Sequence, residues 1–173
     1  YEEHYKNGKK EGLIIGWYEN GQKEFEGHFI DGEKSGFWTV WYENGQKESE
    51  GHYKDGKDDG LVFRWHENGQ KEREVNFKNK KEDGPWTFWY ENGQKKSEGD
   101  CKDGKAEGLR TDFYENGNKE FEAPYKDGKL NGLGISWYEN GQKKSTGHFK
   151  NGEKEGLWSE WTEGGERREK WLN

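Results

Sequence analysis

Hydrophobic and polar positions alternate along the chain in short runs, each closed by a glycine-containing turn. Phe37, Thr39 and Trp41 occupy every second position of one run, which ends at Asn44-Gly45. A second, more polar run follows and ends at Asp55-Gly56. Alternation with a period of two is typical of β-strands, and Asn-Gly and Asp-Gly are strong hairpin signals. The pattern therefore predicts pairs of antiparallel strands, and no segment shows the 3.6-residue period of an amphipathic helix.

This pair of runs recurs every 24 residues without insertions. Its most regular marker is the tripeptide Glu-Asn-Gly, which begins at Glu19, Glu43, Glu67, Glu91, Glu115 and Glu139 and decays to Glu163-Gly164-Gly165 in a seventh copy. A constant period indicates one supersecondary unit stacked along an axis. We predict an all-β fold, an elongated single-layer antiparallel β-meander sheet of about seven two-strand repeats. In this interpretation residues 1–173 form a single repeat array, with units starting near 12, 36, 60, 84, 108, 132 and 156 and a partial repeat at 1–11.

Side-chain alternation also predicts how the two strands of a repeat pair. A three-residue loop at 43–45, a type I turn closed by a glycine bulge, places Trp41 opposite Lys47 and Phe37 opposite Gly51. Glycine at position 51 then leaves room for a large neighbour on the facing strand. We therefore expect Phe37 to lie on the same face as Trp41.

The same parity argument applies to the second turn of the repeat. It gives a loop of three or five residues centred on Gly56 and pairs Gly51 with Leu61. Phe37, Thr39 and Trp41 then lie on the better-covered face of the sheet. The column of Trp41 and its equivalents alternates with the column of Lys47, and two alternatives are open there: a cation–π ladder, or lysines that are simply solvated.

Composition supports a thin aromatic core. Hydrophobic residues make up only 26% of the chain, but they include 10 Trp, 9 Tyr and 9 Phe, which bury large areas per residue. The net charge of −7 comes from acidic and basic residues mixed along the chain, with no basic block. This balance argues against nucleic-acid binding and against attachment to anionic membranes. No apolar run approaches the length of a membrane span.

Three sets of residues resemble catalytic or metal sites, and each has a simpler interpretation. His4, His28, His52 and His148 share one repeat position, but repeats about 9 to 10 Å apart cannot bring their imidazoles to one ion. The glutamates of the Glu-Asn-Gly tripeptides carry no asymmetry between acid and base, which favours a role in the turns. Cys101 replaces an aromatic residue of other repeats and is interpreted as a small buried side chain. We predict no catalytic residue, no metal and no cofactor.

The repeat resembles a known family. Residues 27–36 and 147–156 match the Gly-x-aromatic-x-Asp/Asn-Gly-x-x-x-Gly core of MORN repeats, and with Trp41-Tyr42-Glu43-Asn44-Gly45-Gln46-Lys47 the similarity is to the bacterial MORN-repeat variant. Trp38 stands where the eukaryotic pattern commonly has a second glycine, so lipid binding by eukaryotic members transfers poorly. The resemblance implies an elongated antiparallel sheet used for protein interaction or scaffolding. Similar bacterial arrays are often described as antitoxin components.

One column of the repeat varies while the others stay constant, and we interpret it as a partner-binding face. It lies opposite the face of Trp41 in the expected register, and its candidate contact residues are Trp38, Trp86, Trp158, Ile14 and Val62. Large aromatic side chains dominate the binding energy of many interfaces. The alternative is that these side chains only stabilise the sheet.

The resulting functional expectation is a non-enzymatic scaffold that binds a protein partner. The alternatives are an antitoxin component of a bacterial toxin–antitoxin system and a peripheral phospholipid-binding module. We expect a monomer, with end-to-end or edge-strand association open. The chain has no methionine and opens within a repeat, so a removed leader or a cytoplasmic truncation are both open, and the compartment is not predicted.

Overall fold

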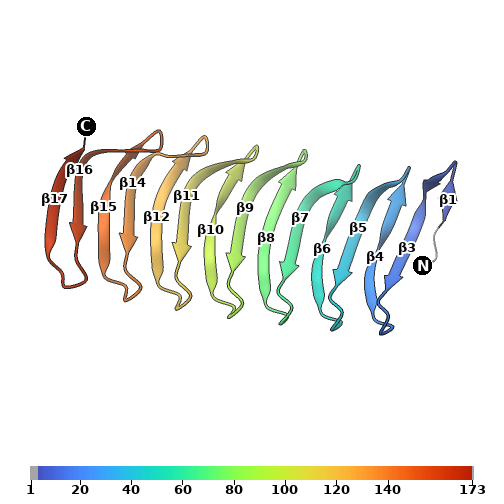
Figure 1. Ribbon diagram of the computed structural model, residues 1–173. Coiled ribbons are helices and arrows are strands. Elements are labelled where there is room, and N and C mark those ends of the chain that lie inside the picture. The colour runs from blue at the N-terminus through green and yellow to red at the C-terminus, as the bar shows by residue number, and fades with distance from the viewer. Residues whose placement is uncertain (1–3, 173) are drawn as a thin grey trace. The chain divides into compact units, whose positions relative to one another are not determined.

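The computed structural model describes residues 4–172 and consists entirely of strands and turns among them. The chain divides into two compact units, residues 1–82 and 83–173. Within each unit the strands follow one another in chain order and pair antiparallel with their neighbours (Figure 1). The predicted fold class, an all-β antiparallel meander, is confirmed. The partial repeat expected at 1–11 begins in residues outside the described range.

The N-terminal unit contains a small hairpin and six longer strands. The hairpin is β1 (Tyr5–Lys6) with β2 (Lys9–Lys10). The longer strands are β3 (Gly12–Trp17), β4 (Lys23–Ile30), β5 (Glu33–Trp41), β6 (Lys47–Lys54), β7 (Lys57–Trp65) and β8 (Lys71–Lys78).

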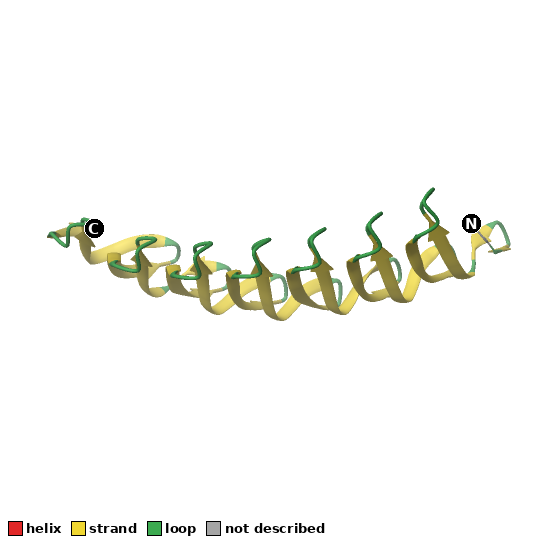
Figure 2. Ribbon diagram, turned by 90° about the horizontal axis from the view of Figure 1, so that it is seen from below, coloured by secondary structure: helices red, strands yellow, loops and turns green. Residues whose placement is uncertain are grey.

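The C-terminal unit repeats the pattern. Its strands are β9 (Lys81–Trp89), which contains the boundary, β10 (Lys95–Lys102), β11 (Lys105–Phe113), β12 (Lys119–Lys126), β13 (Lys129–Leu130), β14 (Gly132–Trp137), β15 (Lys143–Lys150), β16 (Glu153–Trp161) and β17 (Arg167–Leu172). The short β13 pairs with β12. Within each unit the Glu-Asn-Gly turns bend to the same side of the sheet (Figure 2).

The first turn of the repeat has the predicted geometry. Tyr42 accepts a hydrogen bond from the Gly45 amide (2.9 Å), and its own amide donates to the Gln46 carbonyl (2.8 Å). Gly45 has φ of 84°, a left-handed conformation that glycine adopts without a steric penalty. Trp41 lies opposite Lys47, so the three-residue loop closed by a glycine bulge is confirmed.

The pairing beyond that turn differs from the prediction by one residue. Trp41 faces Lys47 but Val40 faces Ser49, which leaves Glu48 as an extra residue on β6. Such a β-bulge shifts the register, and a shift of one residue moves every following side chain to the other face. Trp38, and not Phe37, therefore lies opposite Gly51. The predicted pair Phe37–Gly51 is wrong because the bulge at Glu48 directly follows the glycine bulge of the first turn.

The second turn is also shorter than predicted. Tyr53 pairs with Asp58 and Lys54 with Lys57, so the loop contains only Asp55 and Gly56. Both have positive φ, 50° and 70°, the conformation of a two-residue hairpin turn with a type I′ backbone. A further irregularity between Gly51 and Tyr53 then sets Gly51 opposite Val62 instead of Leu61. The packing reason for glycine here applies to Val62, because a Cβ at position 51 would lie 3.0 Å from the Val62 Cγ2.

The two irregularities define the faces of the sheet. We call the face of Trp38 the inner face and the face of Trp41 the outer face. Trp38 is only 3% exposed whereas its neighbour Phe37 is 49% exposed. The prediction that the face of Phe37 and Trp41 is the better covered is therefore wrong.

Candidate interaction groove

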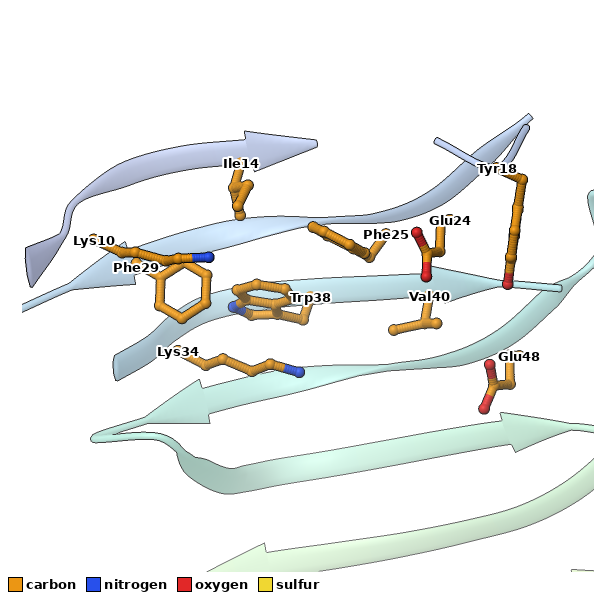
Figure 3. Close-up of a pocket in the computed structure, with 10 residues that line it drawn as sticks. All are labelled: Lys10, Ile14, Tyr18, Glu24, Phe25, Phe29, Lys34, Trp38, Val40 and Glu48. Carbon is orange, nitrogen blue, oxygen red and sulfur yellow. The ribbon is translucent and has the colours of Figure 1, made fainter. Parts of the chain in front are cut away.

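The inner face of the N-terminal unit is hollowed by a groove with a volume of about 340 Å³. Figure 3 shows its lining: two lysines lie at one end, aromatic side chains along the floor and two glutamates at the other end. The lining residues are Lys10, Ile14, Tyr18, Glu24, Phe25, Phe29, Lys34, Trp38, Val40 and Glu48. This volume is in the range of ligand sites in proteins.

The repeated β-bulge is what brings acidic side chains to the aromatic face. Gly16 faces Phe25 and Trp17 faces Lys23, so Glu24 is the extra residue on β4. At a bulge two consecutive side chains can point to one face, and Glu24 and Phe25 both line the groove. Sequence alternation placed Glu24 and Glu48 beside Trp38, as observed, but it set Phe25 on the opposite face and did not name the two glutamates as site residues.

The floor of the groove is built around Trp38. Its ring packs edge-on against Phe29, with 5.1 Å between ring centroids, and stacks with Phe25 at 6.2 Å. Its indole N–H donates to the His28 carbonyl (3.0 Å), which satisfies the one polar atom of the side chain. A Cβ on Gly27 would lie 2.1 Å from the indole ring, so only glycine fits beneath it. The floor is consequently well packed.

The basic end of the groove is formed by Lys34 and Lys10. The Lys34 ammonium lies 4.4 Å from the centre of the Trp38 ring and 5.1 Å from that of Tyr53. Lys10 lies 5.6 Å from the Phe29 ring centre. Burial lowers the pKa of Lys34, and the charge of Asp58 opposes that shift. The aromatic rings therefore hold these cations at the rim by cation–π attraction.

The acidic end contains Glu24 and Glu48 beside the hydroxyl of Tyr18. That hydroxyl donates to the Trp41 carbonyl (2.7 Å). Burial raises the pKa of Tyr18 above its ordinary value of 10.0, and the charges of Glu24, Glu48 and Glu43 raise it further. The groove thus has a negative end and a positive end separated by aromatic rings.

The five side chains predicted as the partner-binding site are among the most buried in the protein. Exposed fractions are 4% for Ile14, 3% for Trp38, 5% for Val62, 9% for Trp86 and 3% for Trp158. Ile14 and Trp38 belong to the groove, and the other three lie in other repeats. We predicted these side chains to be exposed because we took the opposite face as the better covered. The bulge at Glu48 shifts the pairing by one residue and explains the difference. A direct contact of these residues with a partner stays a prediction.

Variation in this column follows the size of the flanking residues. Trp38 lies over Gly27 and faces Gly51, whereas Val62 faces Gly51 on one side and the larger Val75 on the other. Trp158 likewise lies over Gly147, where a Cβ would be 2.3 Å from the indole. At these positions, large and small side chains compensate across neighbouring strands. This pattern of large residues beside glycine is the sequence signal that could have assigned the inner face.

The outer face carries the predicted ladder of cations and aromatic rings. Lys23 lies 5.6 Å from the Trp41 ring centre, and Lys47 lies at the same distance from Trp65. Equivalent pairs are Lys119 with Trp137, Lys143 with Trp161 and Arg167 with Trp161. The cation–π alternative is therefore confirmed. The same face exposes a leucine or phenylalanine in most repeats: Leu13, Phe37, Leu61, Leu109, Leu133 and Leu157.

The residues considered for other chemistry lie apart from the groove. His52 packs its ring edge-on against Phe37 on the outer face, with 5.2 Å between centroids. Cys101, the single cysteine of the sequence, is half-buried. Between residues 4 and 172 no three His, Cys, Asp or Glu side chains form a group suited to a metal ion. No helix in the described part of the chain is long and apolar enough to cross a membrane.

Comparison with known proteins gives one clear match. The MORN repeat variant matches residues 10–31, 36–55, 58–79, 82–103, 106–127 and 130–151. No curated protein matches the chain. The six matched segments cover most of the sequence and coincide with the structural repeats, so the chain belongs to the MORN repeat variant family.

Proposed function

We propose that this protein is a non-enzymatic scaffold that binds a protein partner through the groove on the inner face of its N-terminal unit. The observation that supports this function is the groove itself, in which charged side chains at both ends flank a buried aromatic floor. A shape of this kind offers apolar contact at the centre and charge recognition at the rim. Membership of a family of repeat scaffolds is consistent with it.

Site-specific photo-crosslinking tests the proposal. A benzophenone amino acid is introduced at Val40, which lines the groove, and in a matched variant at Phe37, which is exposed on the outer face of the same strand. After irradiation in the native cell, the Val40 variant is expected to give one crosslinked protein, identified by mass spectrometry. Crosslinks from position 37 alone would contradict the proposal.

A liposome pelleting assay separates this function from phospholipid binding. We expect no pelleting with vesicles that contain anionic lipid, because Glu24 and Glu48 and the net charge of −7 repel such a surface. Pelleting that is reduced by Lys10→Glu and Lys34→Glu would make the groove a lipid site. Capture of a small toxic protein by crosslinking at Val40 would identify the antitoxin alternative as the specific form of this binding function.

A further inference from the structure

The groove has a direction, because its two ends carry opposite charge. Lys10 and Lys34 lie at the end near the two-residue turns, and Glu24 and Glu48 lie at the end near the Glu-Asn-Gly turns. The Lys34 ammonium reaches back over the Trp38 ring, whereas Glu48 lies beyond Val40. A ligand aligned with the strands therefore meets positive charge, then aromatic rings, then negative charge.

An extended peptide matches this order of chemistry. In an extended chain, alternate side chains point to one side and are spaced by about 7 Å. Residues i, i+2 and i+4 can thus present an acidic, an apolar and a basic side chain to the same surface. An acidic group would lie at the lysine end, the apolar group over Phe25, Phe29 and Trp38, and the basic group at the glutamate end. We propose, resting on the function above, that the groove binds an extended partner segment of the form acid-x-apolar-x-base, in either chain direction.

Two observations favour a peptide over other occupants. The groove volume of about 340 Å³ suits a few side chains rather than a folded domain. An anionic headgroup would match only the lysine end and would be repelled by Glu24 and Glu48 at the other. A peptide that carries both charges satisfies both ends at once, and this complementarity supports specificity more than raw affinity.

Fluorescence polarisation with defined peptides tests the proposal on the full chain. The probes are fluorescein-labelled Glu-Gly-Phe-Gly-Arg and Arg-Gly-Phe-Gly-Glu, with Gln-Gly-Phe-Gly-Gln and Glu-Gly-Phe-Gly-Glu as controls. We expect at least one of the two mixed-charge probes to bind about tenfold more tightly than either control peptide, because each control lacks one or both charge contacts. Equal binding of all four probes would overturn the proposal.

Charge reversal locates the site. Glu24→Lys with Glu48→Lys is expected to weaken the mixed-charge probe about tenfold, and the neutral pair Glu24→Gln with Glu48→Gln to weaken it less. Lys144→Gln, at the equivalent position of the C-terminal unit, is the matched control and should leave binding unchanged. A circular-dichroism melt of each variant verifies its fold. An unchanged affinity in a folded Glu24→Lys, Glu48→Lys variant would overturn the proposal.

Failure here is distinguishable from failure of the proposed function. If crosslinking at Val40 captures a partner but no mixed-charge probe binds, the scaffold function stands and the peptide class is wrong. Crosslinking of one copy of this chain to another through position 40, with no binding of the probes, would likewise overturn the peptide and assign the groove to self-association.

Discussion

The two units share one repeat but differ in the charge of the bulge residue. In the N-terminal unit the extra residue on the second strand is Glu24, Glu48 or Glu72. In the C-terminal unit it is Lys96, Glu120 or Lys144. The bulge residue has no partner position in the ladder, so its identity is free of the constraints that fix the turn. The fold can therefore stay the same while the charge of the bulge residue changes.

The tyrosines next to the bulge residues have different neighbours in the two units. Lys96 lies 5.5 Å from the Tyr90 ring centre and Lys144 lies 5.3 Å from that of Tyr138. In the N-terminal unit, Tyr18 instead has Glu24 and Glu48 nearby, both of which raise its pKa. The lysines of the C-terminal unit thus cover aromatic rings, whereas the glutamates of the N-terminal unit give the groove its negative end. The aromatic cores beneath remain similar, since Phe29–Trp38 and Phe149–Trp158 are both edge-on pairs at 5.1 Å.

The largest expected effect comes from removal of the buried tryptophan in each of these cores. Trp38→Ala should destabilise the protein by about 3–5 kcal/mol in urea unfolding followed by circular dichroism, because a large buried ring is removed. Trp158→Ala should cost somewhat less, because the Trp38 N–H donates a hydrogen bond whereas the Trp158 N–H has no partner among the described residues. The control is Phe37→Ala on the exposed face, with a much smaller loss. A larger loss for Phe37→Ala than for Trp38→Ala would reverse the assignment of the faces.

Adding a methyl group beneath the tryptophan is expected to be the next largest effect. Gly27→Ala would bring a Cβ to 2.1 Å from the Trp38 ring, whereas at Gly51 the nearest atom, on Val62, is 3.0 Å away. Overpacking of this kind costs about 1–3 kcal/mol. We expect Gly27→Ala, and Gly147→Ala in the C-terminal unit, to lower the melting temperature more than Gly51→Ala. Equal melting temperatures for all three variants would contradict the tight approach at Gly27.

A stabilising change is expected in the one turn that departs from the pattern. Lys80 has φ of 67°, whereas its equivalent Gly56 has φ of 70° without a side chain. A left-handed conformation costs a residue other than glycine about 1–2 kcal/mol. Lys80→Gly should therefore raise the free energy of unfolding by about 1 kcal/mol, measured by urea titration. Gly56→Lys is the matched control and should lower it, and a destabilising Lys80→Gly would refute the explanation.

The smallest expected effect is a change in tyrosine pKa when the charge of a bulge residue is reversed. Glu48 raises the pKa of both Tyr18 and Tyr42, after burial, whereas Glu120 contributes to Tyr90 and Tyr114. Glu48→Lys should lower the pKa of Tyr18 and Tyr42 toward 10.0 and leave the other two unchanged. NMR titration of ¹³C-labelled tyrosine measures this shift. A similar shift at Tyr90 would contradict the local origin of the effect.

The sign of the pH dependence follows from the raised pKa values. A hydroxyl whose pKa is raised on folding contributes stability that is fully present below the ordinary value of 10.0 and is lost as the pH rises through the folded value. The wild type should therefore begin to lose stability above about pH 10, and Glu48→Lys should begin at the same pH but lose less in total, because its folded-state tyrosine pKa values are less raised. Melting temperatures at stepped alkaline pH check this difference.

The period and the turn chemistry made much of the fold predictable. Asn44 and Gly45 specify the three-residue loop, and the 24-residue spacing specifies the order of the strands. Alternation alone could not assign the faces of the sheet. The extra residue Glu48 has no distinctive sequence feature, and it shifts by one the pairing of every residue that precedes Trp41 in β5. The groove was missed for the same reason, since alternation places Glu24 and Phe25 on opposite sides. Elongation of the whole array stays a prediction, which small-angle scattering checks.

The hydrogen bonds that join successive turns have a consequence for how the chain can change in length. Within the N-terminal unit, Tyr18 donates to the carbonyl of Trp41, Tyr42 to that of Trp65 and Asn20 to that of Glu43, each across 23 residues. The separation of bonded groups along the chain thus stays constant as repeats accumulate, and the loop-closure entropy of each new contact does not grow. Duplication of a single 24-residue segment would create the same local bonds again, so gene duplication can lengthen such a protein without redesign of its existing parts.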